Sequence, residues 1–278
     1  MSFTTDSTLA FIGGGNMARS LIGGLLARGI DAQRIVVADP VAAALEALQE
    51  RFDVNVAQSN AVAVQSANVV ILAVKPQEMH RVVAELAPTF ARTAPLIISV
   101  AAGIRASDIQ RWSGGMPIVR CMPNRPALQG CGMTGLFATP DVSAERRALV
   151  VELMSAVGAT LWVDHETQMD AVTALSGSGP AYFFLLIEML EQTGVTLGLS
   201  PAVSHRLAVE TAYGSGLMAR EASESPATLR QQVTSKGGTT AAALEHLEAH
   251  DVRAIFAAAV TAAARRSAEL ADEFGANQ

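Results

Sequence analysis

The first half of the chain alternates short apolar runs with longer stretches in which apolar residues recur at helical spacing. The short runs are rich in Val, Ile and Leu, a pattern typical of strands that are buried on both faces. Their alternation with helices predicts a parallel sheet that is covered on both sides. The predicted strands are Leu9–Ile12, Arg34–Ala38, Asn68–Val74, Leu96–Val100, Ile118–Cys121, Gly132–Phe137 and Thr160–Val163. The predicted helices among them are Met17–Arg28, Val41–Arg51, Glu78–Leu86, Ser107–Trp112 and Ser143–Val157.

After about residue 165 the strand pattern stops and only helix-like stretches follow. Ser200-Pro201 and Ser225-Pro226 each resemble a helix N-cap followed by proline at the first helical position. The longest helices are apolar around most of their circumference, which predicts burial against a second copy of the chain. We therefore expect two domains, residues 1–165 and 166–278, the second an all-helical dimerisation domain. The predicted helices are Glu166–Leu175, Gly179–Leu197, Pro201–Arg220, Pro226–Val233, Thr239–Glu248 and Asp251–Phe274.

Composition narrows the classes of partner. The net charge of −6 argues against nucleic acid as a partner. Half of the residues are apolar, which is enough for a large core.

The N-terminus has no signal-peptide pattern, and apolar runs such as Ala181–Ile187 are short for a membrane span, so a soluble cytoplasmic protein is expected. Cys121 and Cys131 fit no metal or redox spacing, and His246 and His250 lack an obvious third ligand, so no metal site is predicted.

The segment Gly13–Ala18 follows a predicted strand and opens a predicted helix. It is a G-x-G-x-x-A form of the dinucleotide fingerprint, in which glycines allow a tight turn and a close approach to the pyrophosphate. The alternative is a glycine-rich turn with no ligand. In this context the pattern favours a Rossmann-type domain that binds NADPH or NADH. The predicted contacts are Gly13, Gly14, Gly15, Asn16 and Met17.

The second predicted strand is followed by Asp39. An acidic residue at this place usually bonds the ribose 2′-hydroxyl and disfavours a 2′-phosphate, so Asp39 favours NADH. Two alternatives remain open: Asp39 caps the helix that follows Pro40, or Arg34 or Arg51 meets a phosphate.

Three later strands end in residues suited to line the cofactor, because the carboxyl ends of parallel strands meet at one edge of a sheet. Lys75 could be read as a general acid, but we favour a cofactor-lining role. Asn124 could reach the nicotinamide or the substrate. The predicted cofactor contacts here are Ala73, Val74, Lys75, Pro76, Val100, Ala101, Ala102 and Asn124.

The late segment Val233–Thr240 reads Val-Thr-Ser-Lys-Gly-Gly-Thr-Thr. If Thr239 and Thr240 open a helix, their backbone N–H groups point at whatever lies in front and form a cradle for a small carboxylate. An ordinary N-capped loop is the alternative when the segment is read alone.

These segments, in this order, resemble pyrroline-5-carboxylate reductases, the enzymes of the last step of proline synthesis. The resemblance covers nearly the whole chain. Its first motif is general to Rossmann proteins, and its last, Leu229–Thr240, is specific to this family. The matching segments are Gly13–Ala18, Ala73–Pro76, Ser99–Gly103, Met122–Asn124, Ser176–Tyr182 and Pro226–Glu245.

The resemblance implies a helical domain that interlocks with a partner chain, and hydride transfer from NADPH or NADH to the C=N carbon of a five-membered cyclic imine. It implies that Asn60 lies near the adenosine and that Thr240, the expected catalytic residue, bonds the ring nitrogen. The family commonly has proline at the position of Lys236 and threonine at the position of Arg125, and the effect of these two departures on binding stays open. How many dimers assemble also stays open. The implied substrate contacts are Val233, Ser235, Gly238, Thr239 and Thr240.

Three other functions compete. A β-hydroxyacid dehydrogenase has a similar layout but needs a general base, typically a lysine early in the second domain, and Ser176–Glu188 contains none. Another imine reductase of the same two-domain layout is also an alternative. Nothing in the sequence excludes a dinucleotide sensor without turnover; loss of the substrate cradle would distinguish it, and this sequence carries the cradle.

Overall fold

The computed structural model describes residues 7–276, which form two compact units. The first contains the chain up to Gly177 together with the segment from Ala263 onward, and the second contains Ser178–Ala262. The last long helix therefore divides between the units. A compact unit and a functional domain can have different boundaries. The predicted boundary between functional domains, at residues 165 and 166, therefore stays a prediction.

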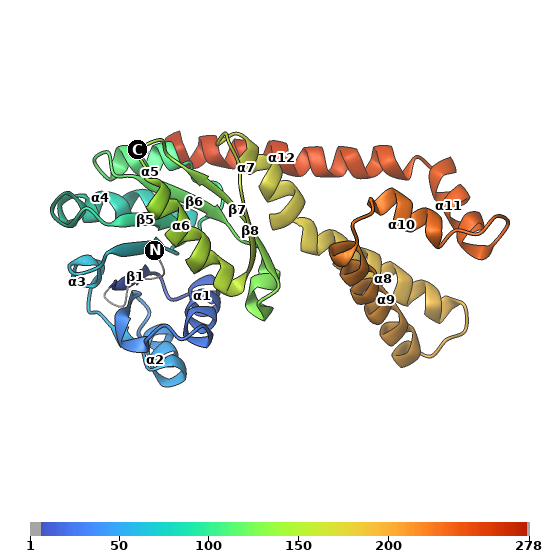
Figure 1. The fold of residues 1–278 in the computed structure, drawn as a ribbon, viewed down its shortest axis with the longest axis horizontal. Coiled ribbons are helices and arrows are strands. Elements are labelled where there is room, and N and C mark those ends of the chain that lie inside the picture. The colour runs from blue at the N-terminus through green and yellow to red at the C-terminus, as the bar shows by residue number, and fades with distance from the viewer. Residues whose placement is uncertain (1–6, 277–278) are drawn as a thin grey trace. The chain divides into compact units, whose positions relative to one another are not determined.

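The first unit is built on a sheet of eight strands in the order β3-β2-β1-β4-β5-β6-β7-β8 (Figure 1). All neighbours pair in parallel except β6 and β7, which are antiparallel. The order reverses between β1 and β4, where helices leave toward opposite faces, as in a Rossmann fold. The strands are β1 Leu9–Ile12, β2 Ile35–Ala38, β3 Asn55–Val56, β4 Val69–Leu72, β5 Leu96–Ser99, β6 Ile118–Met122, β7 Gly132–Ala138 and β8 Gly158–Trp162.

Helices cover both faces of this sheet, as the sequence predicted. Side chains of α1, α2 and α6 pack on one face, and those of α3, α4 and α5 pack on the other. The α-helices of this unit are α1 Asn16–Ala27, α2 Ala42–Phe52, α3 Asn60–Val64, α4 Pro76–Thr93, α5 Ala106–Trp112, α6 Ala144–Met154 and α7 Gln168–Val172. Shorter turns are the 3₁₀ segments η1 Ala32–Arg34, η2 Arg125–Gln129 and η3 Ser155–Val157, and the π-helix η4 Thr173–Gly177.

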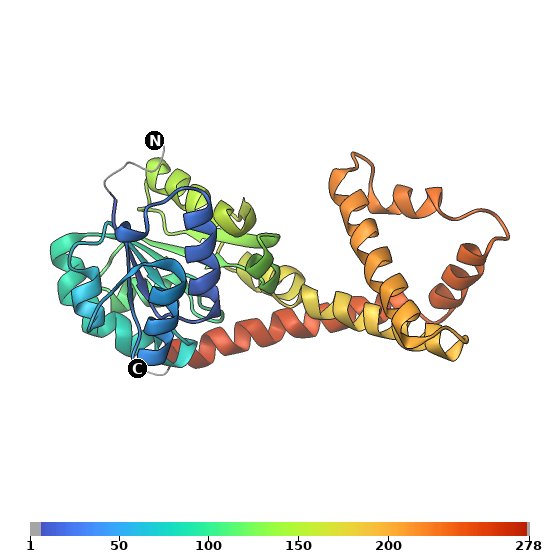
Figure 2. The ribbon, with the colours of Figure 1, turned by 90° about the horizontal axis from the view of Figure 1, so that it is seen from below.

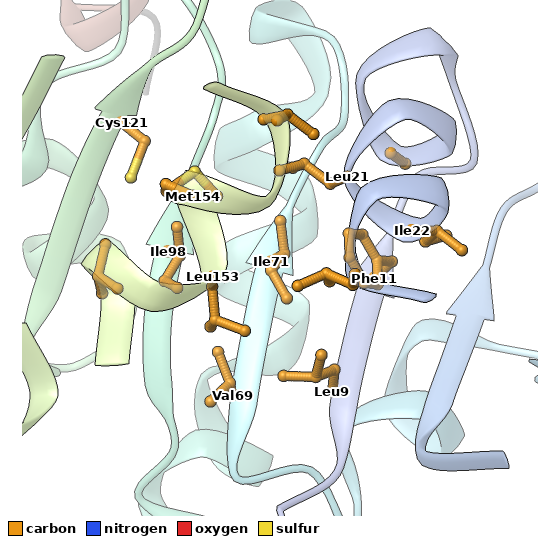
Figure 3. Packing of buried hydrophobic residues seen from close by; sticks show 14 of the residues in the cluster. Leu9, Phe11, Leu21, Ile22, Val69, Ile71, Ile98, Cys121, Leu153 and Met154 are labelled. Atoms are coloured by element: carbon orange, nitrogen blue, oxygen red, sulfur yellow. The ribbon is translucent and has the colours of Figure 1, made fainter. Parts of the chain in front are cut away.

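The strands alternate between two cores. In β1, Leu9 and Phe11 point to the face covered by α1 and α6, where Figure 3 shows them beside Leu21, Ile71 and Leu153. The intervening residues of β1 point to the opposite core. Burial on both faces explains why these strands lack polar alternation.

Two elements differ from the sequence prediction for local reasons. Helix α4 was expected to end at Leu86 but continues through Pro88 to Thr93. Proline removes one backbone hydrogen bond, yet Phe90 is fully buried beyond it and anchors the last turns. The connection from β6 to β7 is short, so it returns the chain antiparallel to β6 and not through a helical crossover.

The second unit contains only helices in the residues that belong to it. Helices α8 and α9 lie side by side in both views (Figures 1 and 2). The predicted caps are confirmed, because the hydroxyls of Ser200 and Ser225 accept backbone N–H groups at the starts of α9 and α10. The helices are α8 Gly179–Thr196, α9 Pro201–Glu221, α10 Pro226–Gln232, α11 Thr239–Ala249 and α12 Val252–Ala276, which ends in the first unit.

Large apolar side chains of α8 remain open to solvent in a single chain. Phe183 is 66% exposed and Phe184 is 60% exposed, and Leu185, Leu186 and Met189 are similar. One stretch, Gln168–Thr196, is long and apolar enough to cross a membrane, and 11% of its most apolar window is buried. A membrane span and a protein interface both fit such a surface.

Candidate active site

The predicted cofactor residues follow strands whose carboxyl ends meet at one edge of the sheet. Gly13 follows β1, Asp39 follows β2, Ala73 follows β4, Val100 follows β5, and Asn124 lies just beyond β6. All five strands run in the same direction. This edge, at the point where strand order reverses, is where Rossmann proteins bind dinucleotides.

Backbone hydrogen bonds fix the first residues of this edge against their neighbours. The N–H of Gly13 donates to Ala38 at 2.8 Å, and the N–H of Ala73 donates to Ile12 at 2.8 Å. The glycine loop therefore lies between the ends of β2 and β4.

The three glycines of the loop serve different purposes. A Cβ on Gly13 would lie 2.6 Å from the carbonyl oxygen of Ala73, and its φ of +103° suits only glycine. A Cβ on Gly14 would lie 2.9 Å from the side chain of Leu48. A Cβ on Gly15 would meet no atom within 4 Å, and Gly15 is exposed at the start of α1. The fold thus requires glycine at Gly13, and a larger residue at Gly14 would push on the buried Leu48 side chain. Packing does not require Gly15, whose open face fits a closely approaching pyrophosphate.

Asp39 holds the glycine loop in place. One carboxylate oxygen accepts the N–H of Gly14 at 2.7 Å, and the other accepts the N–H of Val41 at 2.8 Å. The second contact lies before α2, whose N-cap is Val41 with no side-chain cap, so Asp39 does not cap this helix and the helix-capping alternative is wrong. A carboxylate has further acceptor sites, so a bond to ribose remains open to Asp39 as well.

The cations considered for a 2′-phosphate lie elsewhere. Arg34 precedes β2, at the amino edge of the sheet, and donates to the carbonyl of Ser7. Arg51 is in the last turn of α2, with its guanidinium 5.0 Å from the centre of the Phe52 ring. Arg19, which sequence reasoning missed, contacts the glycine loop: its Nε donates to the carbonyl of Gly14 at 3.3 Å. Its position in the sequence, directly after the dinucleotide fingerprint, was the pattern that could have predicted a cation near the cofactor.

The remaining edge residues differ in exposure. Lys75 is exposed and precedes Pro76, the first residue of α4. Val100 is half-buried, Ala101 is buried and Ala102 is exposed. Asn60 is half-buried and is the first residue of α3, in which the hydroxyl of Ser59 accepts the N–H of Val62. Val74 and Met17 are half-buried, and Asn16 is exposed.

Asn124 is engaged with the protein itself. Its Nδ2 donates to the carbonyl and hydroxyl oxygens of Ser176, both at 3.2 Å, and its Oδ1 accepts the N–H of Met133 at 2.9 Å. A nicotinamide contact by this side chain stays a prediction. Arg125, next along the chain, is exposed.

In the second unit, the predicted substrate segment joins α10 to α11. Gly238 is the N-cap of α11 and supplies no side-chain cap, so the first N–H groups of the helix, on Thr239 and Thr240, have no capping side chain. Helix α11 is eleven residues long, and its N-terminus carries a partial positive charge. This end of the helix suits a carboxylate.

Ser235 lies directly over the same helix end. A Cβ on Gly238 would be 2.5 Å from the Ser235 hydroxyl, so this hydroxyl lies against the N-cap residue of α11. The N–H of Gly238 donates to the carbonyl of Ser235 at 3.0 Å, which closes the turn. Val233 and Lys236 are exposed in this loop. A separate hollow of about 320 Å³ lies between α10 and α11 and is lined by Arg230, Gln231, Thr234, Ala241, Leu244, Glu245 and Glu248, none of them a predicted substrate contact.

Comparison with known proteins places this geometry in a family. The model described as pyrroline-5-carboxylate reductase dimerisation matches residues 166–270, and one described as NADP oxidoreductase, coenzyme F420-dependent, matches residues 8–103. A pyrroline-5-carboxylate reductase of Pseudomonas aeruginosa is 48% identical, over 96% of this chain and 98% of its own length. One of Arabidopsis thaliana is 40% identical, over 94% of this chain and 95% of its own.

The chain belongs to the pyrroline-5-carboxylate reductase family. A solved pyrroline-5-carboxylate reductase of Coxiella burnetii matches with a TM-score of 0.91 and 42% identity, over 95% of this chain and 98% of the other. A Plasmodium falciparum relative, solved with NADP bound, matches with a TM-score of 0.84 and 28% identity, over 96% and 99%. The predicted fold class and the prediction of an NAD(P)H-dependent oxidoreductase are confirmed.

The family also accounts for the exposed apolar surface of α8. The dimerisation model covers the whole of α8, α9, α10 and α11. A homodimer interface therefore explains the exposed phenylalanine and leucine side chains, as the sequence predicted.

Proposed function

We propose that this chain reduces the C=N bond of 1-pyrroline-5-carboxylate to L-proline, with NADPH or NADH as the hydride donor. The observation that carries the proposal is the uncapped N-terminus of α11 with Ser235 over it, in a chain whose other unit has a dinucleotide edge. Relatives that match over nearly their full length bear the name of this reaction, which supports it.

In the first unit, the amides of the glycine loop would hold the pyrophosphate, with Gly15 leaving room for it and Asp39 keeping the loop in shape. Asn60 would line the adenosine. Residues Ala73–Pro76 and Val100–Ala102 would line the rest of the cofactor. When bound, the reduced nicotinamide supplies the hydride.

In the second unit, the Ser235 hydroxyl and the N–H groups of Thr239 and Thr240 would hold the substrate carboxylate at the positive end of α11. The Thr240 hydroxyl would bond the ring nitrogen. Val233 and Gly238 would complete the contact surface. A protonated imine is already electrophilic, so holding it in position is most of what the chain must do.

We also propose that NADH is used at least as well as NADPH. Asp39 places a carboxylate beside the glycine loop, while Arg34 and Arg51 are at the far edge of the sheet. Arg19 supplies a positive charge beside the glycine loop for the 2′-phosphate of NADPH, so use of both cofactors is expected.

The two functional domains are proposed to be residues 1–165 and 166–278. The dimerisation domain supports a homodimer, and assembly of dimers into larger oligomers is an extension of that proposal. The cyclic imine is the proposed small-molecule partner, and a cytoplasmic location remains a prediction.

The substitution Thr240→Ala tests the assignment of the substrate site. Loss of the proposed hydrogen bond to a charged ring nitrogen is worth about 1.5–3 kcal/mol, which lowers kcat/KM about 10- to 100-fold. The dinucleotide Kd and the melting temperature should stay near the wild-type values.

Thr234→Ala is the matched control. This threonine lies in the same loop, but its hydroxyl donates to the carbonyl of Arg230 at 2.6 Å and is not a proposed substrate contact. It should lose stability and keep kcat/KM. A Thr240→Ala variant with a lowered melting temperature and an unchanged kcat/KM would show that Thr240 only supports the helix.

A further inference from the structure

The turn that follows β5 carries predicted cofactor contacts, and the last turns of α12 pack on it within the first compact unit. The predicted contacts are Val100–Ala102, of which Ala102 is exposed. The next residue, Gly103, has a φ of +71°. A Cβ on Gly103 would lie 3.3 Å from the Phe274 ring and 3.4 Å from the Cβ of Leu270. Two side chains of α12 therefore lie directly against the backbone of this turn.

The same end of α12 also contacts α5, the helix that the turn leads into (Figure 1). The Arg105 guanidinium donates to the Asp272 carboxylate at 2.5 Å, and Arg105 is the N-cap residue of α5. Within α5, the carboxylate of Asp108 lies close to α12, because a Cβ on Gly275 would be 2.7 Å from it. Asp108 is only 7% exposed. The segment Leu270–Gly275 thus contacts both the turn and the helix after it.

The two ends of the turn are fixed by the sheet. At its start, the N–H of Val100 donates to a carbonyl of β4 at 3.1 Å. At its end, Glu166, between β8 and α7, accepts the N–H of Ala106 at 2.5 Å and lies 3.2 Å from Arg120. Arg120 is on β6 and is 2% exposed. Between these two ends, the turn packs on α12.

We propose that Phe274, with Leu270, is a positioning residue that holds the turn after β5 in the conformation that binds the dinucleotide. Neither side chain is a predicted cofactor contact, and both act through the backbone at Gly103. The effect on the cofactor rests on the proposed function. When a binding conformation is populated in only a fraction of molecules, the apparent Kd rises by the inverse of that fraction. Removing the Phe274 ring therefore weakens binding although every cofactor-lining residue is unchanged.

The test compares two phenylalanines of the first unit that have similar surroundings. Phe274 is half-buried near the end of α12, and Phe52 is half-buried at the end of α2. A Cβ on Gly23 would lie 3.3 Å from the Phe52 ring, which repeats the contact that Phe274 makes. Gly23, however, is in the middle of α1 and outside the cofactor-lining turn. Phe52→Ala is therefore the matched control for Phe274→Ala, and Phe274→Leu is the conservative variant.

Each variant of the full-length chain is measured for its NADH Kd by titration well below its melting temperature, for that melting temperature, and for hydrogen exchange of residues 100–106. Phe274→Ala should raise the NADH Kd about 10-fold, as for a turn that is competent in about one molecule in ten, and exchange at 100–106 should rise. Phe274→Leu keeps an apolar side chain on Gly103, so its Kd should rise only about 2- to 3-fold. Phe52→Ala should lower the melting temperature and keep the wild-type Kd.

A Phe274→Ala variant with the wild-type Kd, or with a raised Kd but unaltered exchange at 100–106, would overturn the inference. An equal rise of the Kd in Phe52→Ala would also overturn it, because the effect would then follow from lost stability alone. If Phe274→Ala does not fold, the same two measurements on Phe274→Leu decide. Wild-type protein that binds neither NADH nor NADPH would refute the proposed cofactor site, and with it the role of Phe274 in binding.

Discussion

Replacing Gly15 with alanine separates the needs of the fold from the needs of the ligand. The backbone at Gly15 has φ −71° and ψ −174°, which any residue adopts, and the added methyl group would meet no atom within 4 Å. The substitution lowers the conformational entropy of the unfolded chain, which stabilises the fold by about 0.4–1 kcal/mol. Alanine is a poorer N-cap than glycine, which destabilises the fold by a similar amount. The melting temperature should therefore stay within a few degrees of wild type.

Cofactor binding, in contrast to stability, should be weakened by this substitution. The methyl group would stand where the pyrophosphate must approach the loop amides. Loss of one charge-assisted hydrogen bond costs about 1.5–3 kcal/mol, so the NADH Kd should rise at least about 10-fold.

Titration of NADH and thermal melting, run on Gly15→Ala beside Gly14→Ala, check this reasoning. Gly14→Ala should lose stability, because its Cβ would be 2.9 Å from Leu48. A Gly15→Ala variant that binds NADH with the wild-type Kd would refute the claim that the open face of the loop receives the cofactor.

Two further predictions concern Asp39 and the cysteines. Asp39→Asn, which keeps an amide oxygen as acceptor for the N–H of Gly14, and Asp39→Ser, which has only a hydroxyl acceptor on a shorter side chain, should both raise the NADPH:NADH ratio of kcat/KM about 10-fold or more by removing repulsion of the 2′-phosphate. An unchanged ratio in both would show that Asp39 does not read the ribose. Burial raises the pKa of the Cys121 thiol, whereas Cys131 is exposed, so a thiol reagent should titrate one cysteine in the native protein and two in denaturant. Cys131→Ser should abolish the native reaction, and its persistence would contradict this assignment of burial.

Much of this fold was readable from the sequence because the signals were local. Strand β1 was predicted at its observed bounds, and the serine caps of α9 and α10 form as expected. Strand β3 was missed because it is two residues long, too short for any periodicity. Helix α4 passes Pro88 because tertiary burial outweighs the lost hydrogen bond.

The chemistry of the site was predictable in part. Motifs located the strand ends and the loop that precedes α11, since these depend on residue type and order, and the substrate contacts assigned to that loop stay a prediction. Contacts between distant segments left no local signal, and the bond from Asn124 to Ser176 spans 52 positions. The same holds for Arg120, which is 2% exposed and pairs with Glu166 at 3.2 Å. Such pairs become visible only when the topology is known.

We propose that the dinucleotide edge and the carboxylate cradle of this chain together serve the reduction of a cyclic imine. The most direct measurement is cofactor oxidation by the purified chain with 1-pyrroline-5-carboxylate, run with NADH and with NADPH, and with the product identified. Cofactor oxidation should depend on the imine with both cofactors and be at least as fast with NADH, and L-proline should form in an amount equal to the cofactor consumed. Absence of imine-dependent oxidation with either cofactor, from protein that binds NADH, would contradict this proposal.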